Sequence, residues 1–505
     1  MISPNQYFES ADWLVIAVYL VGIILFGLWI GKDQKNTRDY FLGSKSIPWW
    51  GVGLSIVATE TSALTFIGVP ALAYGTNLGL LQIIVGYVIA RIVLAIFLVP
   101  HYFKGEIYSP YQLFSDAFGP AAGRTAAGFF LIAGTLAAGV RVYVTCIPLQ
   151  LMLGTDKWVR GSDGILPAIL LFVGLSLVYT YAGGIKAVVW TDAVQFFLFM
   201  AGGVFTLLYI PQLFDGGFQE VLSKAGNGGK LDWLNLHFSL AMPYNLWMGI
   251  VGGTVHVLSS HGADQLLVQR VLTCKSAGDG RKALLLSAVI IFPLFVFFLL
   301  TGAMLWVYYQ RFPLAVPIPE TTTGMSKNDY IYPIFILTAV PPVLKGFLIV
   351  AILSAAMSSV SSALSALASV STMDLIKGPS QAQLSEKDSL TRSRYSTAGW
   401  AVALVGVAYA SREVPFVFNA AFALTGLTSG ALLGGLLAAL FTKGGSAVPV
   451  ITGMLISLAV MTAVQLKTNV AWPWFTLIGA NVTILVVLLV RQVMFLGQRG
   501  AAPRE

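Results

Sequence analysis

The sequence predicts an all-α membrane protein with about thirteen transmembrane helices. Of its 505 residues, 57% are hydrophobic and only 10% are charged, whereas about a quarter of the residues in an average soluble domain are charged. A soluble protein of this length needs a charged surface, and this sequence has too few charges to form one. The composition argues against soluble enzymes, nucleic-acid binders and disordered proteins, and two cysteines cannot form a disulfide framework.

Apolar segments set the predicted number of spans, because a transmembrane helix needs about 20 mostly apolar residues. No Lys or Arg precedes the first segment, so we do not interpret it as a cleavable signal peptide. The predicted spans are residues 11–31, 49–75, 78–103, 121–153, 165–184, 187–211, 242–268, 283–309, 342–376, 397–411, 414–441, 447–465 and 472–495.

Positive charges in the loops predict the orientation. With the N-terminus outside, nineteen Lys and Arg residues fall in the inner loops and nine in the outer loops. An excess of positive charge marks cytoplasmic loops. We therefore expect a multi-pass protein of the cell's inner (plasma) membrane, with its N-terminus outside and its C-terminus in the cytoplasm.

Two of the predicted spans contain a break. Residues 58–63 of the second span are small and polar, and Gly68 and Pro70 follow them. The seventh span has a matching irregularity at residues 252–254 and 259–262. Corresponding breaks are typical of transporters with inverted repeats. For the first break, a proline-kinked packing helix is the alternative.

The spacing of the two breaks predicts the internal organisation. They lie five spans apart, so we expect a core of two inverted repeats of five helices each, with discontinuous helices at the midplane. The expected regions are an extra N-terminal helix with a cytoplasmic loop (1–48), a first repeat (49–211), a second repeat (242–441), and peripheral C-terminal helices with a short cytoplasmic tail (442–505).

The ninth span carries a stripe of hydroxyl groups on one helical face. Oxygen ligands of this kind suit a hard cation such as Na⁺ better than a transition metal. The alternative is a packing helix in which each serine bonds to its own preceding turn. The serines that share the face are Ser354, Ser358, Ser361, Ser362, Ser365 and Ser369.

Ionisable groups inside predicted spans are costly and indicate functional sites. Glu60, Arg91, Arg141, Asp192 and Asp264 fall at such positions. Two of them have a structural alternative. Asp264 is also consistent with a helix end that faces the cytoplasm, and Arg91 with the partner of a structural ion pair.

Several stretches together resemble the sodium:solute symporter family, and the resemblance covers nearly the whole chain. The sequence GGIKAVVWTDAVQ at residues 183–195 is the most specific of them. The resemblance implies the inverted-repeat fold of the bacterial leucine transporter and the import of a solute with Na⁺. The other matching stretches are residues 39–43, 47–50, 58–68, 264–270, 372–374 and 425–427.

The resemblance also implies where Na⁺ binds. Members of this family hold their main ion with oxygens of the broken helix and of the serine-rich helix. Some members have a second ion on an aspartate and two hydroxyls, and one or two Na⁺ ions are therefore expected here. The main site aligns with Ala58, Thr61, Ala355, Ser358 and Ser359, and the second site with Asp192, Ser361 and Ser362.

The aligned solute site favours a carboxylate over a sugar. In galactose-carrying members, polar side chains surround the sugar, and most of these are missing here at Glu60, Thr65, Val257, Val289 and Phe422. Ser260 replaces their inner aromatic gate. A buried site cannot leave many sugar hydroxyls unpaired.

In members that carry sialic acid, an arginine and two hydroxyls hold the carboxylate. These align with Arg141, Ser62 and Thr65, and the planar fork of arginine suits a carboxylate. Gln82 aligns loosely with the same pocket. Two alternatives stay open, namely that Arg141 pairs with Glu60, or that Glu60 meets the ammonium of a zwitterion.

These observations predict Na⁺-driven import of a small organic solute, with the lipid bilayer as surroundings, no nucleic acid and one chain as the functional unit. The expected solute bears a carboxylate, as a monocarboxylate, a sialic-acid-like compound or an amino acid such as proline does. A sugar or polyol is the alternative. A proton-coupled carrier, a transporter-like sensor and an intramembrane enzyme are disfavoured, the last because the four histidines show no metalloprotease spacing.

Overall fold

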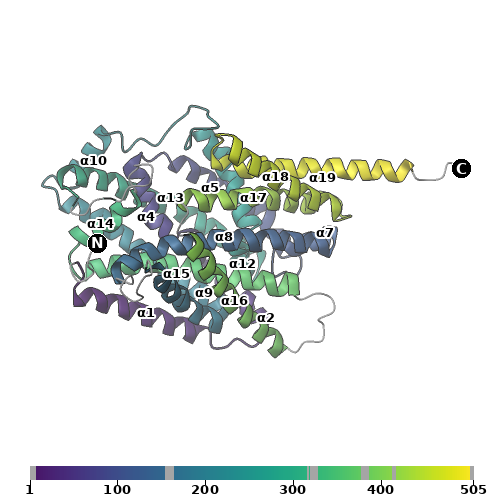
Figure 1. Ribbon diagram of the computed structural model, residues 1–505, viewed down its shortest axis with the longest axis horizontal. Coiled ribbons are helices and arrows are strands. Elements are labelled where there is room, and N and C mark those ends of the chain that lie inside the picture. The colour runs from purple at the N-terminus through teal and green to yellow at the C-terminus, as the bar shows by residue number, and fades with distance from the viewer. Residues whose placement is uncertain are drawn as a thin grey trace.

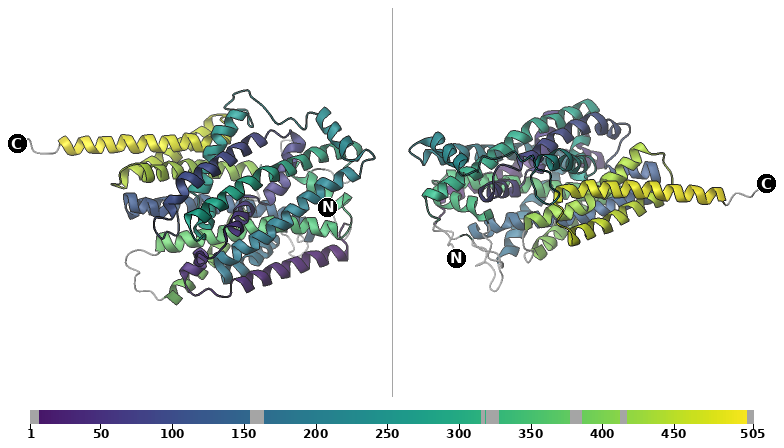
Figure 2. Two further views of the ribbon diagram at one scale, coloured as in Figure 1. Left: turned by 180° about the vertical axis from the view of Figure 1, so that it is seen from behind. Right: turned by 90° about the horizontal axis from the view of Figure 1, so that it is seen from above.

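The computed structural model describes residues 7–153, 164–314, 318, 328–376, 386–411 and 417–500. Within these ranges the secondary structure is helical and contains no strand, in agreement with the predicted class. The helices pack side by side in an elongated bundle, with α1 along one flank and α19 extending beyond the others (Figures 1 and 2).

The α-helices are α1 (Ser10–Ile30), α2 (Thr37–Leu42), α3 (Trp49–Glu60), α4 (Ala63–Gly75), α5 (Leu81–Val93), α6 (Val99–Tyr102), α7 (Tyr111–Phe118), α8 (Pro120–Leu153), α9 (Ile165–Gln212), α10 (Gly217–Asn227), α11 (Thr254–Gly262), α12 (Gln265–Leu272), α13 (Ala277–Arg311), α14 (Ile331–Ala339), α15 (Leu344–Val370), α16 (Glu386–Ala410), α17 (Val417–Phe441), α18 (Val448–Lys467) and α19 (Phe475–Gly500). Short π-helical segments η3 (Leu94–Leu98), η5 (Met248–Gly253) and η7 (Ser371–Ile376) adjoin α5, α11 and α15.

Eight helices in the described ranges are long and apolar enough to cross a membrane, or nine if the bent pair α3–α4 is one span. The predicted number of thirteen therefore stays a prediction. Part of the difference lies in α9, which covers two predicted spans in 48 residues. Its backbone leaves the helical region at Gly184, where φ is 54° and ψ is −154°, so the predicted spans are its two arms.

The predicted break in the second span is present. The axes of α3 and α4 differ by 58°, and Thr61 and Ser62 between them have extended backbones. Ser62 begins α4, because its Oγ accepts the Leu64 amide at 3.2 Å and Thr65 Oγ1 accepts the Ser62 amide at 3.3 Å. A serine followed three residues later by a side chain that can reach back is a typical helix start.

The matching irregularity in the seventh span is present too. A π-helical segment, η5, leads into α11, and α11 ends at Gly262. Asp264 then begins α12, because its side chain accepts the Leu266 amide at 2.8 Å. Asp264 is therefore at a helix end, and whether this end faces the cytoplasm stays a prediction.

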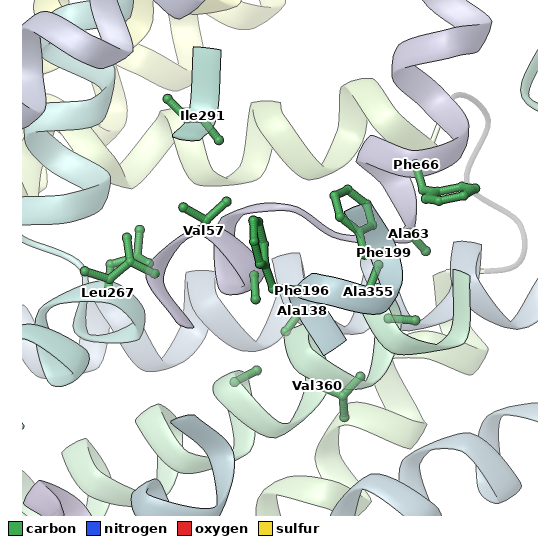
Figure 3. Packing of buried hydrophobic residues seen from close by; sticks show 14 of the residues in the cluster. Val57, Ala63, Phe66, Ala138, Phe196, Phe199, Leu267, Ile291, Ala355 and Val360 are labelled. Atoms are coloured by element: carbon green, nitrogen blue, oxygen red, sulfur yellow. The ribbon is translucent and has the colours of Figure 1, made fainter. Parts of the chain in front are cut away.

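The serine-rich helix α15 is the centre of the bundle. In its most apolar window 89% of residues are buried inside the protein, against 17% for the peripheral α1. It packs against α9, α1 and α8. Apolar side chains from several helices fill the space around it, as Figure 3 shows for Val57 (α3), Phe66 (α4), Ala138 (α8), Phe196 and Phe199 (α9), Ile291 (α13), and Ala355 and Val360 (α15).

Replacement of Gly184 by alanine is expected to destabilise the protein by about 2 kcal/mol or more, because only glycine readily adopts this backbone conformation. A Cβ atom at this position would also lie 2.4 Å from the Tyr40 carbonyl oxygen. Gly174→Ala on the same helix is the matched control, since a Cβ there meets nothing within 4 Å. The melting temperature in detergent measures the effect, and equal values for both variants would contradict this account.

Candidate ion and solute site

The hydroxyl stripe of α15 is buried and bonds mainly to other helices. All six serines are at most 1% exposed. Ser358 donates to Asp192 Oδ1 on α9 at 2.7 Å, and Ser362 bonds to Thr59 on α3 at 3.2 Å. Ser361 instead donates to the Ser358 carbonyl of its own helix at 3.1 Å. The alternative of a packing helix, in which each serine bonds to its own preceding turn, therefore describes only part of the stripe.

Asp192 connects α9 to three other helices. Its Oδ2 accepts a hydrogen bond from Ser55 on α3 at 2.6 Å, and Arg270 Nη2 on α12 lies 3.3 Å from the same oxygen. Arg270 also donates to Ser362 and, through Nε, to Ser55 at 3.2 Å. The side chains of Asp192 and Arg270 are fully buried. Two residues of the expected second ion site, Asp192 and Ser362, thus share one arginine.

Sequence reasoning assigns Arg270 no role in the site, because residue 270 follows the predicted span 242–268 and counts among the positive charges of the inner loops. A signal was nevertheless present. A carboxylate buried in the membrane requires a positive partner or a bound cation. Arg270 lies only eight residues after the second break, in a helix that the break turns back into the protein.

The α3–α4 break changes the backbone hydrogen bonding at the expected main ion site. In a continuous helix the Ser62 amide would bond to the Ala58 carbonyl. It bonds instead to Thr65 Oγ1, which leaves the Ala58 carbonyl without its helical donor. The Thr61 hydroxyl donates to the Val57 carbonyl at 2.7 Å, so Thr61 has an acceptor within its own helix.

One cavity adjoins this break. It lies between the start of α4, α8, the start of α12, α15 and α17, and Ser62 and Ser359 both line it. Ser359 donates to the Ala355 carbonyl at 3.2 Å, and its neighbour Ala356 lines the cavity. The break and Ser359 of α15 therefore border a common space, whereas none of the six serines of the stripe lines it. Its other polar lining residues are Arg141, Thr145, Asp264 and Thr425.

Arg141 on α8 faces this cavity. In the described part of the chain, its guanidinium has no carboxylate oxygen within 4 Å and no side-chain hydrogen-bond partner. Asp264 lines the same cavity beyond ion-pair distance, and its charge acts on Arg141. An anionic group in the cavity would therefore meet an available planar donor.

Glu60 does not pair with Arg141. Its carboxylate contacts Arg91 on α5, and His261 Nε2 lies 3.6 Å from the same oxygen. Arg91 also donates to the Ser287 hydroxyl at 3.1 Å. The alternative in which Arg141 pairs with Glu60 is therefore wrong. Arg91 is the partner of a buried ion pair, as its structural interpretation predicted. Glu60 does not line the Arg141 cavity in this structure, and its contact with a solute ammonium stays a prediction.

The remaining expected solute residues are dispersed. Gln82 lies outside the cavity, since its amide nitrogen donates to the Tyr244 carbonyl at 2.8 Å and its oxygen accepts the Asn235 amide at 2.9 Å. Ser260 bonds to His261 Nδ1 at 3.0 Å and does not line the cavity either. Thr65 stays next to Ser62 through the helix cap. The side chain of Phe422 lies outside the described residues.

The broken second span, the matching irregularity before α12 and a polar cavity between α4, α8, α12, α15 and α17 define the class of protein, namely a secondary transporter with a central binding site. Comparison with known proteins identifies the family. The sodium:solute symporter family matches residues 40–457, and the chain belongs to this family. It is accordingly a sodium-coupled solute transporter of the membrane and not an enzyme.

Relatives and solved structures agree with this assignment. The sodium/sialic acid symporter SiaT of Proteus mirabilis is 27% identical over 94% of this chain and 93% of its own length. The sodium-coupled monocarboxylate transporter 1 of mouse (Mus musculus) is 26% identical over 89% of this chain and 72% of its own length. A substrate-bound, outward-open Na⁺-coupled sialic acid symporter aligns with a TM-score of 0.85 at 24% identity, over 96% of this chain and 98% of its own.

Removal of Arg270 is expected to destabilise the protein in Na⁺-free buffer. Arg270→Gln leaves the Asp192 carboxylate buried without its partner, which costs about 3–5 kcal/mol. Arg270→Gln with Asp192→Asn removes both charges and should recover part of the loss. Melting temperatures of the two single variants and the double variant measure this coupling. Strictly additive effects would show that the two side chains do not stabilise each other.

Proposed function

We propose that this symporter carries a small solute with a carboxylate group into the cell together with Na⁺. The single observation that carries the proposal is the Arg141 guanidinium, which faces the central cavity without a carboxylate partner in the described part of the chain. The other two arginines in this region, Arg91 and Arg270, already contact Glu60 and Asp192. Only Arg141 is available to a solute.

The chemistry of the cavity supports a carboxylate. Arginine presents two parallel N–H donors that match the two oxygens of a carboxylate. The Ser62 hydroxyl accepts the Leu64 amide, so its own hydrogen is free to point at a solute oxygen. An unpaired charge inside the membrane costs at least about 2.5 kcal/mol, and a bound carboxylate would offset this for Arg141. We place Thr65 beside Ser62 as a supporting hydroxyl.

The relatives support an anionic solute without identifying it. Two of them carry sialic acid or monocarboxylates by name, and the human sodium/iodide cotransporter is 27% identical over 92% of this chain. An inorganic anion therefore belongs in any substrate panel, beside proline and a neutral sugar. Mutual competition among monocarboxylates, sialic acid and proline would indicate one carboxylate subsite.

For the main Na⁺ site we propose the oxygens of Ala58, Thr61, Ala355, Ser358 and Ser359. The Ala58 carbonyl, which has lost its helical donor, and the position of Ser359 at the cavity support this assignment. For a second Na⁺ we propose Asp192, Ser361 and Ser362. Ser358 links the two sets, because its hydroxyl donates to Asp192.

We also propose the finer topology. Residues 49–211 and 242–441 form the two repeats, with residues 1–48 and 442–505 outside them. The N-terminus lies outside the cell's plasma membrane and the C-terminus in the cytoplasm, as the loop charges favour. We propose one chain as the functional unit, without nucleic acid.

Arg141→Lys is expected to weaken binding of the transported carboxylate by about tenfold, because lysine keeps the charge but loses the planar donor pair. Arg141→Gln should weaken it further. Na⁺ affinity should change little in both variants. The dissociation constants of solute and Na⁺, measured on the same detergent preparations, provide the test.

Arg124→Gln is the matched control, because Arg124 lies on the same helix and is exposed. Normal solute binding by Arg141→Gln would contradict the anchor role of Arg141. Transport of a neutral sugar, but of no anion, by the wild-type protein would contradict the solute class itself.

Ser359→Ala is expected to raise the Na⁺ concentration for half-maximal transport by about tenfold, since a charged-group contact is worth about 1.5–3 kcal/mol. Ser358→Ala together with Ser359→Ala should abolish Na⁺-driven uptake. Ser354→Ala is the control, because Ser354 is buried on the same helix and is not a proposed ligand. Unchanged Na⁺ dependence in the double variant would remove α15 from the main site.

A further inference from the structure

A half-buried carboxylate that has no positive partner among the described residues lies beyond the central cavity. Asp374 is in η7, directly after α15. Its side chain contacts the side chains of Ser109 and Gln112, while its Oδ2 atom is buried and makes no hydrogen bond within the described residues. None of the ion pairs in the described ranges includes Asp374. Buried carboxylates are normally paired or bind a cation.

Further unpartnered oxygens surround the same segment, residues 108–112. The Gln265 amide nitrogen donates to the Tyr108 carbonyl at 2.7 Å and to Ser369 at 3.2 Å. Gln265 is fully buried, yet its Oε1 has no hydrogen-bond partner in the described part of the chain. This oxygen belongs to α12, whereas Asp374 belongs to the end of α15, so two helices contribute oxygens around one loop.

Tyr111 adds a third oxygen. Its hydroxyl is fully buried and has no side-chain hydrogen-bond partner among the described residues. It lies close enough to Asp264 and Asp374 for both carboxylates to act on it, and it is beside the backbone of Gln265. Among the described residues the cluster therefore combines carboxylate and amide oxygens that lack a hydrogen-bond partner with a buried hydroxyl oxygen. Such a set suits a hard monovalent cation better than a soft metal.

The cluster adjoins the proposed ion path. Asp264 lines the central cavity together with Ser359, which we propose as a ligand of the main Na⁺ site, and Asp264 also acts on Tyr111. α7, which Tyr111 begins, lies toward the end of the bundle away from the N-terminus (Figure 1). In the proposed topology this end is cytoplasmic.

We infer that Asp374, Gln265 and Tyr111 form a transient Na⁺ site at the cytoplasmic end of the transport path, where an ion released from the main site is held before it leaves. The inference rests on the proposed function, since it requires Na⁺ to pass through the central cavity. In this position a negative group lowers the electrostatic free-energy barrier for a cation that leaves the cavity through an apolar, low-dielectric part of the protein. It also makes release sensitive to Na⁺ in the cytoplasm.

The first test uses Na⁺ alone on the purified full-length protein. In Na⁺-free choline buffer, Asp374→Asn should be as stable as the wild type or more stable, because the variant removes an uncompensated buried charge. Its increase in melting temperature on addition of Na⁺ should be smaller than that of the wild type. Asp33→Asn is the control, an exposed carboxylate in the loop after α1, which the proposed topology places on the same side.

The second test measures sidedness by ²²Na⁺ exchange in proteoliposomes. Asp374→Asn should raise the half-saturating Na⁺ concentration on the cytoplasmic side by about tenfold, the effect of losing a charged contact. The half-saturating concentration on the outer side should change less than about twofold, within experimental scatter. Tyr111→Phe should raise the half-saturating Na⁺ concentration on the cytoplasmic side as well, but by less. This variant keeps the proposal testable if Asp374→Asn does not fold.

The outcomes separate the inference from the proposed function. If the wild type shows neither a Na⁺-induced shift in melting temperature nor ²²Na⁺ exchange, the proposed function fails. If the wild type responds and both variants respond identically to it, the cluster binds water or only braces the helices, and the inference alone is overturned. An effect confined to outer Na⁺ would overturn it as well.

Discussion

The buried Asp192 carboxylate is the interaction on which the arrangement of the central helices depends. Removal of a carboxylate from water costs several kcal/mol unless charges and hydrogen bonds compensate it. Ser55 on α3, Arg270 on α12 and Ser358 on α15 supply this compensation to a single group on α9. Because four helices meet at one charge, a cation that binds Asp192 competes with Arg270. If Na⁺ binds at Asp192 as we propose, its binding is in this way coupled to the positions of the helices.

The helix breaks provide the second requirement of a transporter, which is backbone polarity at membrane depth. Irregular backbone is tolerated there only where it is buried in protein or lines a cavity. Side chains satisfy part of it here, since Ser62 caps α4 and Asp264 caps α12. The Ala58 carbonyl lacks its helical donor, which is why we propose it as an ion ligand. Both caps also line the Arg141 cavity, so the residues that begin these helices are the residues beside the proposed solute site.

Features that depend on local sequence could be predicted, and features that depend on distant pairs could not. The serine stripe of α15 and the break after residue 60 follow from helical periodicity and from capping residues. The pairs Asp192–Arg270 and Glu60–Arg91 join residues 78 and 31 positions apart, and no local pattern encodes them. Gln82 was misplaced for the same reason, because its partner Tyr244 lies 162 residues away.

Because most of these buried charges are paired, the net charge of the loaded transporter depends on the bound solute and Na⁺ ions. Glu60 with Arg91 and Asp192 with Arg270 are neutral as pairs, so they contribute little net field to the cavity. A solute carboxylate on Arg141 with one Na⁺ adds no net charge to the membrane interior, where net charge is costly. A second Na⁺ adds one positive charge, which moves in response to the membrane potential at about 2.3 kcal/mol per 100 mV. The number of ions bound thus determines whether the membrane potential or only the Na⁺ gradient drives uptake.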